Sequence, residues 1–190
     1  MIKVAIIGQQ CSGKTTLSNM LRKHVPHSRV IKFADPIYHA QNGLGQPKCR
    51  AFMQDFGDLA KRHFGEMVFV NAFEKSFRAD ALASHGNEWI NMYDMVLCDD
   101  VRRTYELTKV KELGFSVVYV DTPENIRKAR AEHLGLEWIP NHNSETEVPS
   151  MRDDANLVVN GHGWASMEEY EAFIVNMILP MLRVGFKEAA

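Results

Sequence analysis

The sequence is poor in cysteine, has no long apolar run and carries almost no net charge, and each absence excludes a class of protein. Its three cysteines, Cys11, Cys49 and Cys98, are an odd number at unrelated spacings. We therefore expect no disulfide framework and a reducing, cytoplasmic location, the host cytoplasm if the protein is viral. The opening apolar run is too short for a secretory signal. The apolar stretch 173–182 is interrupted by polar and proline residues and cannot span a bilayer.

The charge balance gives the protein no global attraction for polyanions. A formal net charge of -2 provides no basic field for sequence-independent nucleic-acid binding, so any anion site must be built locally. The length of 190 residues suits a single domain with a substantial core. We expect neither nucleic acid nor a membrane as a partner, and the oligomeric state stays open, a homodimer included.

Short apolar runs alternate with helical patterns along the chain. The runs are residues 4–7, 30–33, 95–98, 117–120 and 157–159. None alternates between apolar and polar residues, which is typical of strands buried on both faces of a parallel sheet. Apolar residues at helical spacing predict helices after residue 13, over 52–63, over 107–113 and over 167–179. The sequence thus predicts an α/β fold with a parallel sheet of about five strands flanked by helices.

Other signals mark helix ends and loops. Asp35 and Thr122 each precede a proline, which predicts an N-cap followed by proline at the first helical position. Gly114 follows the third helical pattern and predicts its C-terminal cap. Residues 84–91 read as a loop, and 137–150 as a long polar flap that is too long for a tight connection.

Residues 8–15 carry the most specific motif of the sequence. Gly8 to Thr15 reads GQQCSGKT and matches G-x-x-x-x-G-K-[ST] between a predicted strand and a predicted helix. Gly8 and Gly13 allow successive N–H groups to point into one concavity, with Ser12 and Thr16 beside it, and the helix N-terminus adds positive charge. Lys14 would reach the β and γ phosphates of ATP, and the Thr15 hydroxyl would ligate magnesium. The fold class is therefore that of the P-loop NTPases.

Cys11 lies inside this loop, and two interpretations stay open. The helix dipole lowers the pKa of a nearby thiol and makes it reactive. Alternatively, Cys11 is a small residue at a variable position of the motif.

The rest of the chain narrows the kind of P-loop protein. It contains neither an Asn-Lys-x-Asp nor an Asp-x-x-Gly motif, which argues against a regulatory GTPase, and it is too small for a motor or helicase. A kinase of a small acceptor needs an acceptor pocket, a carboxylate for magnesium, cations for the transferring phosphoryl group and a lid. Candidates for all four parts follow in order.

Acidic and basic residues follow the run 95–98 directly. Asp99 and Asp100 would lie at the ligand edge of the sheet, where one carboxylate can orient magnesium, and Arg102 can bind an acceptor phosphate with two hydrogen bonds. The alternative is a solvated polar strand end. Arg127 and Arg130 share one helical face before the flap and are candidate lid cations, the alternative being a solvated basic face.

Each candidate acceptor residue has a structural alternative. Asp35 follows the second apolar run and is either an acceptor contact or a helix cap. Asp58 and Arg62 are spaced i, i+4 and are either an acceptor-binding pair or a surface ion pair. In the flap, His142 and Glu145 are close in sequence, but one histidine beside one carboxylate is weak evidence for zinc.

The order of these motifs resembles a known family. Its members are the bacteriophage-type deoxynucleoside monophosphate kinases, which belong with the adenylate-kinase-like P-loop kinases. The resemblance runs from Gly8 to about Tyr170. It rests on GxxxxGKT, FADPI, an FGD helix with Arg62, DDVR with Glu106, the Arg127/Arg130 segment, HNSE and VVNG.

The resemblance implies transfer of the γ-phosphate of MgATP to a deoxynucleoside monophosphate. It places Asp100 and Arg102 near the acceptor, Arg127 and Arg130 in the lid, and Asn160 and Gly161 near the adenine. Tyr38 stands where many relatives have a lysine, so the accepted base stays open.

The expected organisation is one kinase domain over 1–190, with an acceptor segment at about 35–85 and a lid at about 127–150. The alternatives are a kinase of another phosphorylated metabolite, such as dephospho-coenzyme A or phosphomevalonate, and an ATP-binding regulatory module without acceptor chemistry.

Overall fold

The structure is a computed structural model that describes residues 1–47, 49–85, 88–139 and 143–185. Contacts divide the chain into two compact units, one of Met1–Val30 with Tyr93–Ala190 and one of Ile31–Met92. The first unit contains a five-stranded sheet and is discontinuous in sequence, whereas the second is a continuous, mainly helical insertion. The prediction of one kinase domain is not tested by this division and stays a prediction.

The sheet of the first unit is parallel throughout, with the strand order β2-β5-β1-β6-β7. Its strands are β1 (Ile2–Ile7), β2 (Ser28–Val30), β5 (Met95–Cys98), β6 (Ser116–Asp121) and β7 (Leu157–Asn160). Strand β1, which precedes the glycine loop of residues 8–15, is the central strand. Its Val4 pairs with both Leu97 and Ser116. The predicted α/β fold with about five parallel strands is confirmed.

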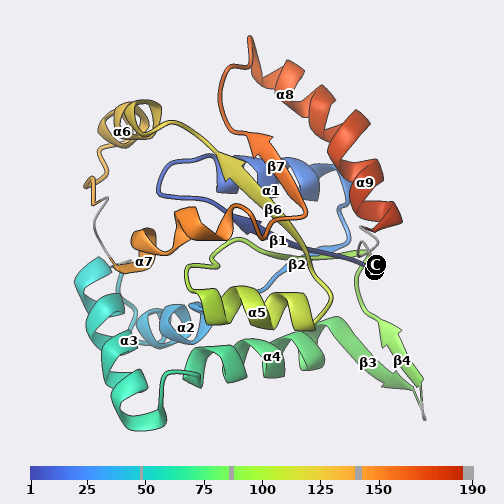
Figure 1. The fold of residues 1–190 in the computed structure, drawn as a ribbon. Coiled ribbons are helices and arrows are strands. Elements are labelled where there is room, and N and C mark those ends of the chain that lie inside the picture. The colour runs from blue at the N-terminus through green and yellow to red at the C-terminus, as the bar shows by residue number, and fades with distance from the viewer. Residues whose placement is uncertain (48, 86–87, 140–142, 186–190) are drawn as a thin grey trace. The chain divides into compact units, whose positions relative to one another are not determined.

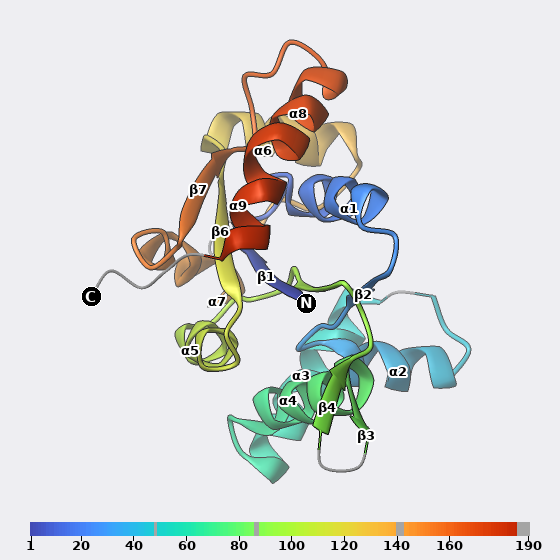
Figure 2. The same ribbon diagram turned by 90° about the vertical axis from the view of Figure 1, so that its right-hand side faces the viewer.

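Helices cover both faces of this sheet (Figures 1 and 2). They are α1 (Lys14–His24), α5 (Thr104–Glu112), α6 (Glu124–His133), α7 (Asn143–Thr146), η1 (Val148–Met151), α8 (Met167–Phe173), η2 (Ile174–Ile178) and α9 (Leu179–Val184). Figure 2 shows α5 and α9 on opposite sides of the sheet. The core against α1 and the α8–α9 run includes Val4, Ile6, Leu17 and Ile174, all fully buried. Because successive strand side chains alternate between faces, Ala5 and Ile7 face the other layer.

The second unit has its own elements. They are α2 (Asp35–Gly43), α3 (Arg50–Phe64), α4 (Val68–Ala81), β3 (Leu82–His85) and β4 (Glu88–Asn91). Phe33 stacks on Phe73 of α4 with ring centres 4.2 Å apart, and both are buried.

Two sequence predictions of strands and loops are wrong. The second strand was expected at 30–33 but spans Ser28–Val30. Ile31 and Phe33 are buried core residues of the helical unit, so their apolar character reflects packing there and not strand pairing. The predicted loop 84–91 contains most of the antiparallel pair β3–β4, which pairs Ser84 with Trp89.

The helix ends also differ in detail from the prediction. Helix α2 begins at Asp35 with Ala34 as its N-cap, and the Asp35 carboxylate accepts the backbone N–H of Lys32 at 2.8 Å. Helix α6 begins at Glu124, so Thr122 is not its cap. Gly114 has φ +75° directly after α5, as its predicted capping role requires.

The predicted C-terminal helix over 167–179 is present and continues to Val184, with one π-helical stretch over Ile174–Ile178. Among the described residues, no helix is both long and apolar enough to cross a membrane.

Candidate active site

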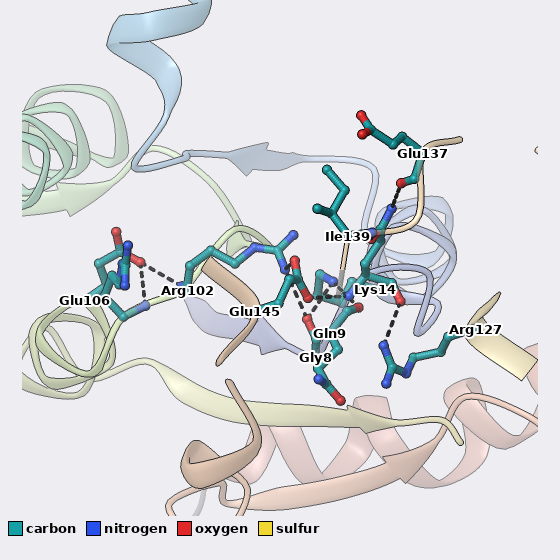
Figure 3. A network of polar contacts seen from close by, with 11 residues as sticks. Gly8, Gln9, Lys14, Arg102, Glu106, Arg127, Glu137, Ile139 and Glu145 are labelled. Carbon is teal, nitrogen blue, oxygen red and sulfur yellow. Dashed lines mark hydrogen bonds and ion pairs between the residues drawn. The ribbon is translucent and has the colours of Figure 1, made fainter. Parts of the chain in front are cut away.

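The glycine loop joins β1 to α1 at the carboxyl edge of the sheet (Figure 3). A Cβ at Gly8 would overlap the Ser12 hydroxyl and lie 2.8 Å from the Val120 carbonyl oxygen, so only glycine fits there without a shift. Gly13 has φ +108°, a left-handed conformation that favours glycine. The loop conformation therefore depends on both glycines of the motif.

Lys14 lies back across its own loop (Figure 3). Its Nζ donates to the carbonyl oxygens of Gly8 at 2.7 Å and Gln9 at 2.9 Å. Burial lowers the pKa of Lys14 to about 7, while the carboxylates of Glu145 and Asp99 act in the opposite direction. The amine is thus held in the concavity of the loop by hydrogen bonds and is not stabilised there as a charge.

Asp99, Asp100 and Arg102 follow β5 at the same edge, as predicted. Asp99 is 8% exposed, and its charge favours protonated Lys14. The carboxylate of Asp100 accepts a hydrogen bond from the thiol of Cys98, with an Oδ1–Sγ distance of 3.4 Å. Asp99 is thus buried and acts electrostatically on Lys14, Asp100 binds a thiol of β5, and neither is a fully solvated strand end.

Glu106 fixes the segment that carries Arg102. Its Oε2 accepts the backbone N–H groups of Arg102 at 2.7 Å and Arg103 at 3.1 Å. The Arg102 guanidinium then pairs with Glu145 of α7 at 2.7 Å (Figure 3). Arg102 is thus oriented from both its backbone and its side chain.

Arg127 is only 5% exposed and contacts the glycine loop directly. Its Nε donates to the carbonyl oxygen of Thr122 at 3.0 Å and its Nη1 to that of Gln10 at 3.4 Å. Its guanidinium carbon lies 5.2 Å from the ring centre of Trp138, within cation–π range.

Arg130 contacts the loop one turn further along α6. Its Nη1 donates to the carbonyl oxygens of Cys11 at 3.2 Å and Ser12 at 3.3 Å, and its Nη2 to that of Gly161 at 2.7 Å. The Thr122 hydroxyl donates to the Ser12 carbonyl at 2.8 Å. Both arginines therefore contact the glycine loop, and the alternative of a fully solvated basic face does not apply to them.

Gly161 packs closely against the glycine loop. It follows Asn160 at the end of β7, and a Cβ on Gly161 would overlap the Ser12 carbonyl and the Thr122 hydroxyl. The Asn160 carbonyl accepts the indole N–H of Trp164 at 2.9 Å. The four loops after β1, β5, β6 and β7 thus meet at one edge, where ligands bind in open α/β sheets.

The structure does not support a reactive Cys11. Burial raises the pKa of its thiol, and the opposing effect of Lys14 and the two arginines does not reverse the shift. Cys11 has φ +58°, an uncommon conformation for a non-glycine residue. Its backbone carbonyl oxygen accepts the hydrogen bond from Arg130. All three cysteines are free, as expected from their number and spacing.

The remaining predicted residues are placed as follows. Thr15 is exposed and Thr16 half-buried in the first turn of α1. Asp35, Tyr38, Asp58 and Arg62 belong to the helical unit, where Asp58 and Arg62 are both exposed.

His142 lies outside the described residues, whereas Glu145 is described and is 4% exposed. Among the ion pairs of the described residues, none joins Asp58 to Arg62. Within the described part of the chain, no three metal-ligating side chains of His, Cys, Asp or Glu gather at one point.

Sequence reasoning missed three contributors, namely Gln10, Thr122 as a loop contact, and Trp138. Gln10 occupies a variable position of the glycine motif, and its side chain contacts residues 127 and 129 positions away. No local pattern signals such pairs. For Glu145, the only signal was its place in a polar cluster of the flap.

The fold is shared with small P-loop kinases of known structure. A shikimate kinase from Acinetobacter baumannii in complex with shikimate matches with a TM-score of 0.53 at 12% identity, covering 95% of this chain and 94% of that chain. A gluconokinase from Sinorhizobium meliloti 1021 matches with a TM-score of 0.52 at 12% identity, covering 94% of each chain. A shikimate kinase from Bacteroides thetaiotaomicron matches with a TM-score of 0.53 at 11% identity, covering 95% and 99%.

No protein-family model and no curated protein sequence matches the chain. At identities this low, the structural likeness establishes the three-layer α/β fold of the small P-loop kinases. The chemistry has to be argued from the site.

Proposed function

We propose that the protein is a kinase that transfers the γ-phosphate of MgATP to the phosphate of a (deoxy)nucleoside 5′-monophosphate, giving the diphosphate and ADP. The observation that carries the proposal is the convergence of Lys14, Arg102, Arg127 and Arg130 on one glycine loop with a buried carboxylate, Asp99, beside them. Phosphoryl transfer needs positioning and charge stabilisation more than covalent chemistry by the protein. Preorganised cations around a phosphate cradle provide both.

In this proposal each group has one role. The backbone N–H groups of 8–15 bind the donor phosphates, and Lys14 binds the β and γ phosphates as its ammonium form. Arg127 and Arg130 stabilise the charge that develops on the transferring group. Asn160 and Gly161 border the donor base, while Asp100 and Arg102 face the acceptor.

The donor set fits magnesium. The ion prefers oxygen ligands and keeps several waters, and the exposed Thr15 hydroxyl and the Asp99 carboxylate are oxygen donors of this kind. Thr15 would ligate the ion and Asp99 would orient its water shell. Bound with ATP, magnesium would neutralise charge on the phosphate oxygens.

The choice of acceptor rests on the motif order from FADPI to HNSE, which resembles that of the bacteriophage-type deoxynucleoside monophosphate kinases. Asp35, Tyr38, Asp58 and Arg62 are the proposed acceptor contacts of the helical unit. A second candidate is favoured by the structural likenesses: an acceptor of the type used by shikimate kinases or gluconokinases, which carries a hydroxyl as the attacking group.

A coupled ADP-release assay over a panel of acceptors tests the proposal. The panel holds ribo- and deoxyribonucleoside monophosphates, shikimate, gluconate, dephospho-coenzyme A and phosphomevalonate. We expect turnover with at least one nucleoside monophosphate, and loss of that turnover in Lys14→Met purified in parallel, which controls for contaminating kinases. Turnover with another panel member alone would overturn the acceptor. ATP binding without transfer to any acceptor would leave the non-catalytic module as the better description.

A further inference from the structure

The backbone N–H, backbone carbonyl and side-chain carboxamide of Gln10 all form hydrogen bonds within the site. Its backbone N–H donates to Glu145 Oε2 at 2.6 Å, and its backbone carbonyl accepts Arg127 Nη1 at 3.4 Å. Its side-chain Nε2 donates to the carbonyl oxygen of Glu137 at 2.7 Å, and its Oε1 accepts the backbone N–H of Ile139 at 3.2 Å. No phosphate-binding role requires any of the last three contacts.

The two side-chain bonds have the pattern of a strand pair. In a parallel pair, one residue donates to the carbonyl before its partner residue and accepts from the N–H after it. The Gln10 carboxamide does the same to Glu137 and Ile139, with Trp138 between them. A carboxamide is the side-chain group that offers donor and acceptor together, as a peptide unit does.

Trp138 connects this pairing to Arg127. The Trp138 ring lies 5.2 Å from the Arg127 guanidinium carbon, and the same guanidinium donates to the Gln10 carbonyl. Gln10 therefore acts on Arg127 twice, directly through its carbonyl and indirectly through the tryptophan that its side chain fixes. Gln10, Trp138 and Arg127 are thus connected to one another by these contacts.

We propose that Gln10 is a positioning residue that pins the segment Glu137–Ile139 to the phosphate loop and thereby holds Arg127 in place over the loop. Its effect on catalysis rests on the proposed function, because it acts through a cation assigned there to the transferring phosphoryl group. The pinning itself does not depend on any substrate. The two parts can therefore be tested separately.

Hydrogen exchange of the free protein tests the pinning. The variants are Gln10→Ala and Gln10→Met, the second keeping most of the side-chain volume without a carboxamide. We expect peptides covering 134–139 to exchange about tenfold faster in both, since the Ile139 N–H loses its acceptor and the segment its second bond. Gln9→Ala is the matched control, because the Gln9 side chain has no hydrogen bond to any described residue, and there we expect wild-type exchange at 134–139.

Steady-state kinetics and ATP binding then test the consequence for Arg127. With an accepted substrate, we expect Gln10→Met to lower kcat by about tenfold to hundredfold while the Kd for ATP changes less than about threefold. If Gln10 contributed only to overall stability, Gln10→Met would affect kcat and the Kd for ATP to a similar extent. Exchange would then become faster throughout the protein and not only at 134–139.

Three outcomes overturn the proposal. They are unchanged exchange at 134–139 in Gln10→Met, faster exchange spread equally over β1 and β6, and a loss of ATP binding that matches the loss of kcat. A wild-type protein without turnover on any acceptor is a different result. It removes the proposed function, and the exchange data still decide whether Gln10 pins the segment.

Discussion

Arg102 and Glu145 form an ion pair with an Nη1–Oε1 distance of 2.7 Å, in which only 5% of the Glu145 side chain is exposed. The other carboxylate oxygen accepts the backbone N–H of Gln10 at 2.6 Å. One carboxylate of α7 thus joins the segment after β5 to the glycine loop. A buried group that satisfies two partners is costly to remove, because both partners stay in place.

Glu145→Gln should lower the free energy of unfolding by about 1.5–3 kcal/mol, the range for hydrogen bonds to charged groups. The substitution keeps the shape of the side chain but removes the charge that Arg102 faces. Urea denaturation followed by circular dichroism measures the effect. Asp154→Asn is the control, because its pair with Lys111 is exposed and should contribute no more than about 1 kcal/mol. Equal losses in the two variants would contradict the importance of burial at Glu145.

Lys14 should make stability rise with pH. Its pKa is about 7 in the folded protein, well below the value of an unfolded lysine, mainly because of burial. Between these two values the unfolded chain binds more protons at this position, so unfolding becomes less favourable as pH rises through the window above 7. Below pH 7 both states are protonated and the penalty for a buried charge is constant.

The measurement is the difference in unfolding free energy between the wild type and Lys14→Met, taken at pH 6, 7, 8 and 9. We expect it to be flat up to about pH 7 and then to move in favour of the wild type by up to about 1.4 kcal/mol per pH unit. The histidines and other titrating groups are common to both proteins and largely cancel. A flat difference up to pH 9 would mean that Lys14 keeps an ordinary pKa.

Gly161→Ala should both destabilise the protein and disturb the glycine loop. A Cβ at this position overlaps the Ser12 carbonyl and the Thr122 hydroxyl and lies 2.7 Å from a Val120 methyl group. Overpacking of this kind costs about 1–3 kcal/mol and moves backbone that the loop needs. Thermal unfolding and ATP titration measure the two effects.

Gly43→Ala is the matched control, because a Cβ at Gly43 meets nothing within 4 Å and alanine favours the helix in which it lies. It should leave stability unchanged or slightly higher. If the two substitutions had equal effects, the close approach of β7 to the loop would not matter.

The sequence predicts the sheet and the loop of the site well for physical reasons. Strands buried on both faces must be apolar throughout, and residues 4–7, 95–98 and 117–120 are short, continuous apolar runs of this kind. The pattern therefore identifies them as strands. The glycine loop is recognisable because its backbone geometry restricts the residue types within eight consecutive positions.

The parts that sequence reasoning missed depend on distant contacts. The β3–β4 pair carries polar residues without alternation, so period gives no signal there. The segment with Ile31 and Phe33 is mistaken for a strand because a short buried apolar segment has the same residue types in a helical unit and in a sheet. Gln10 and Glu145 are 135 residues apart and meet only in the folded chain.

The central position of β1 also bears on how the chain is made. Ile2 pairs with Met95 and Val4 with Ser116, so during synthesis β1 has no strand partner until about 90 further residues have followed. At about 5–20 residues per second, that wait is at least about five seconds. The unit Ile31–Met92 is continuous and is complete before then. The apolar residues of β1 therefore stay without their strand partners while the second unit is completed, and the glycine loop, which contacts Thr122 and Gly161, takes its final form only afterwards.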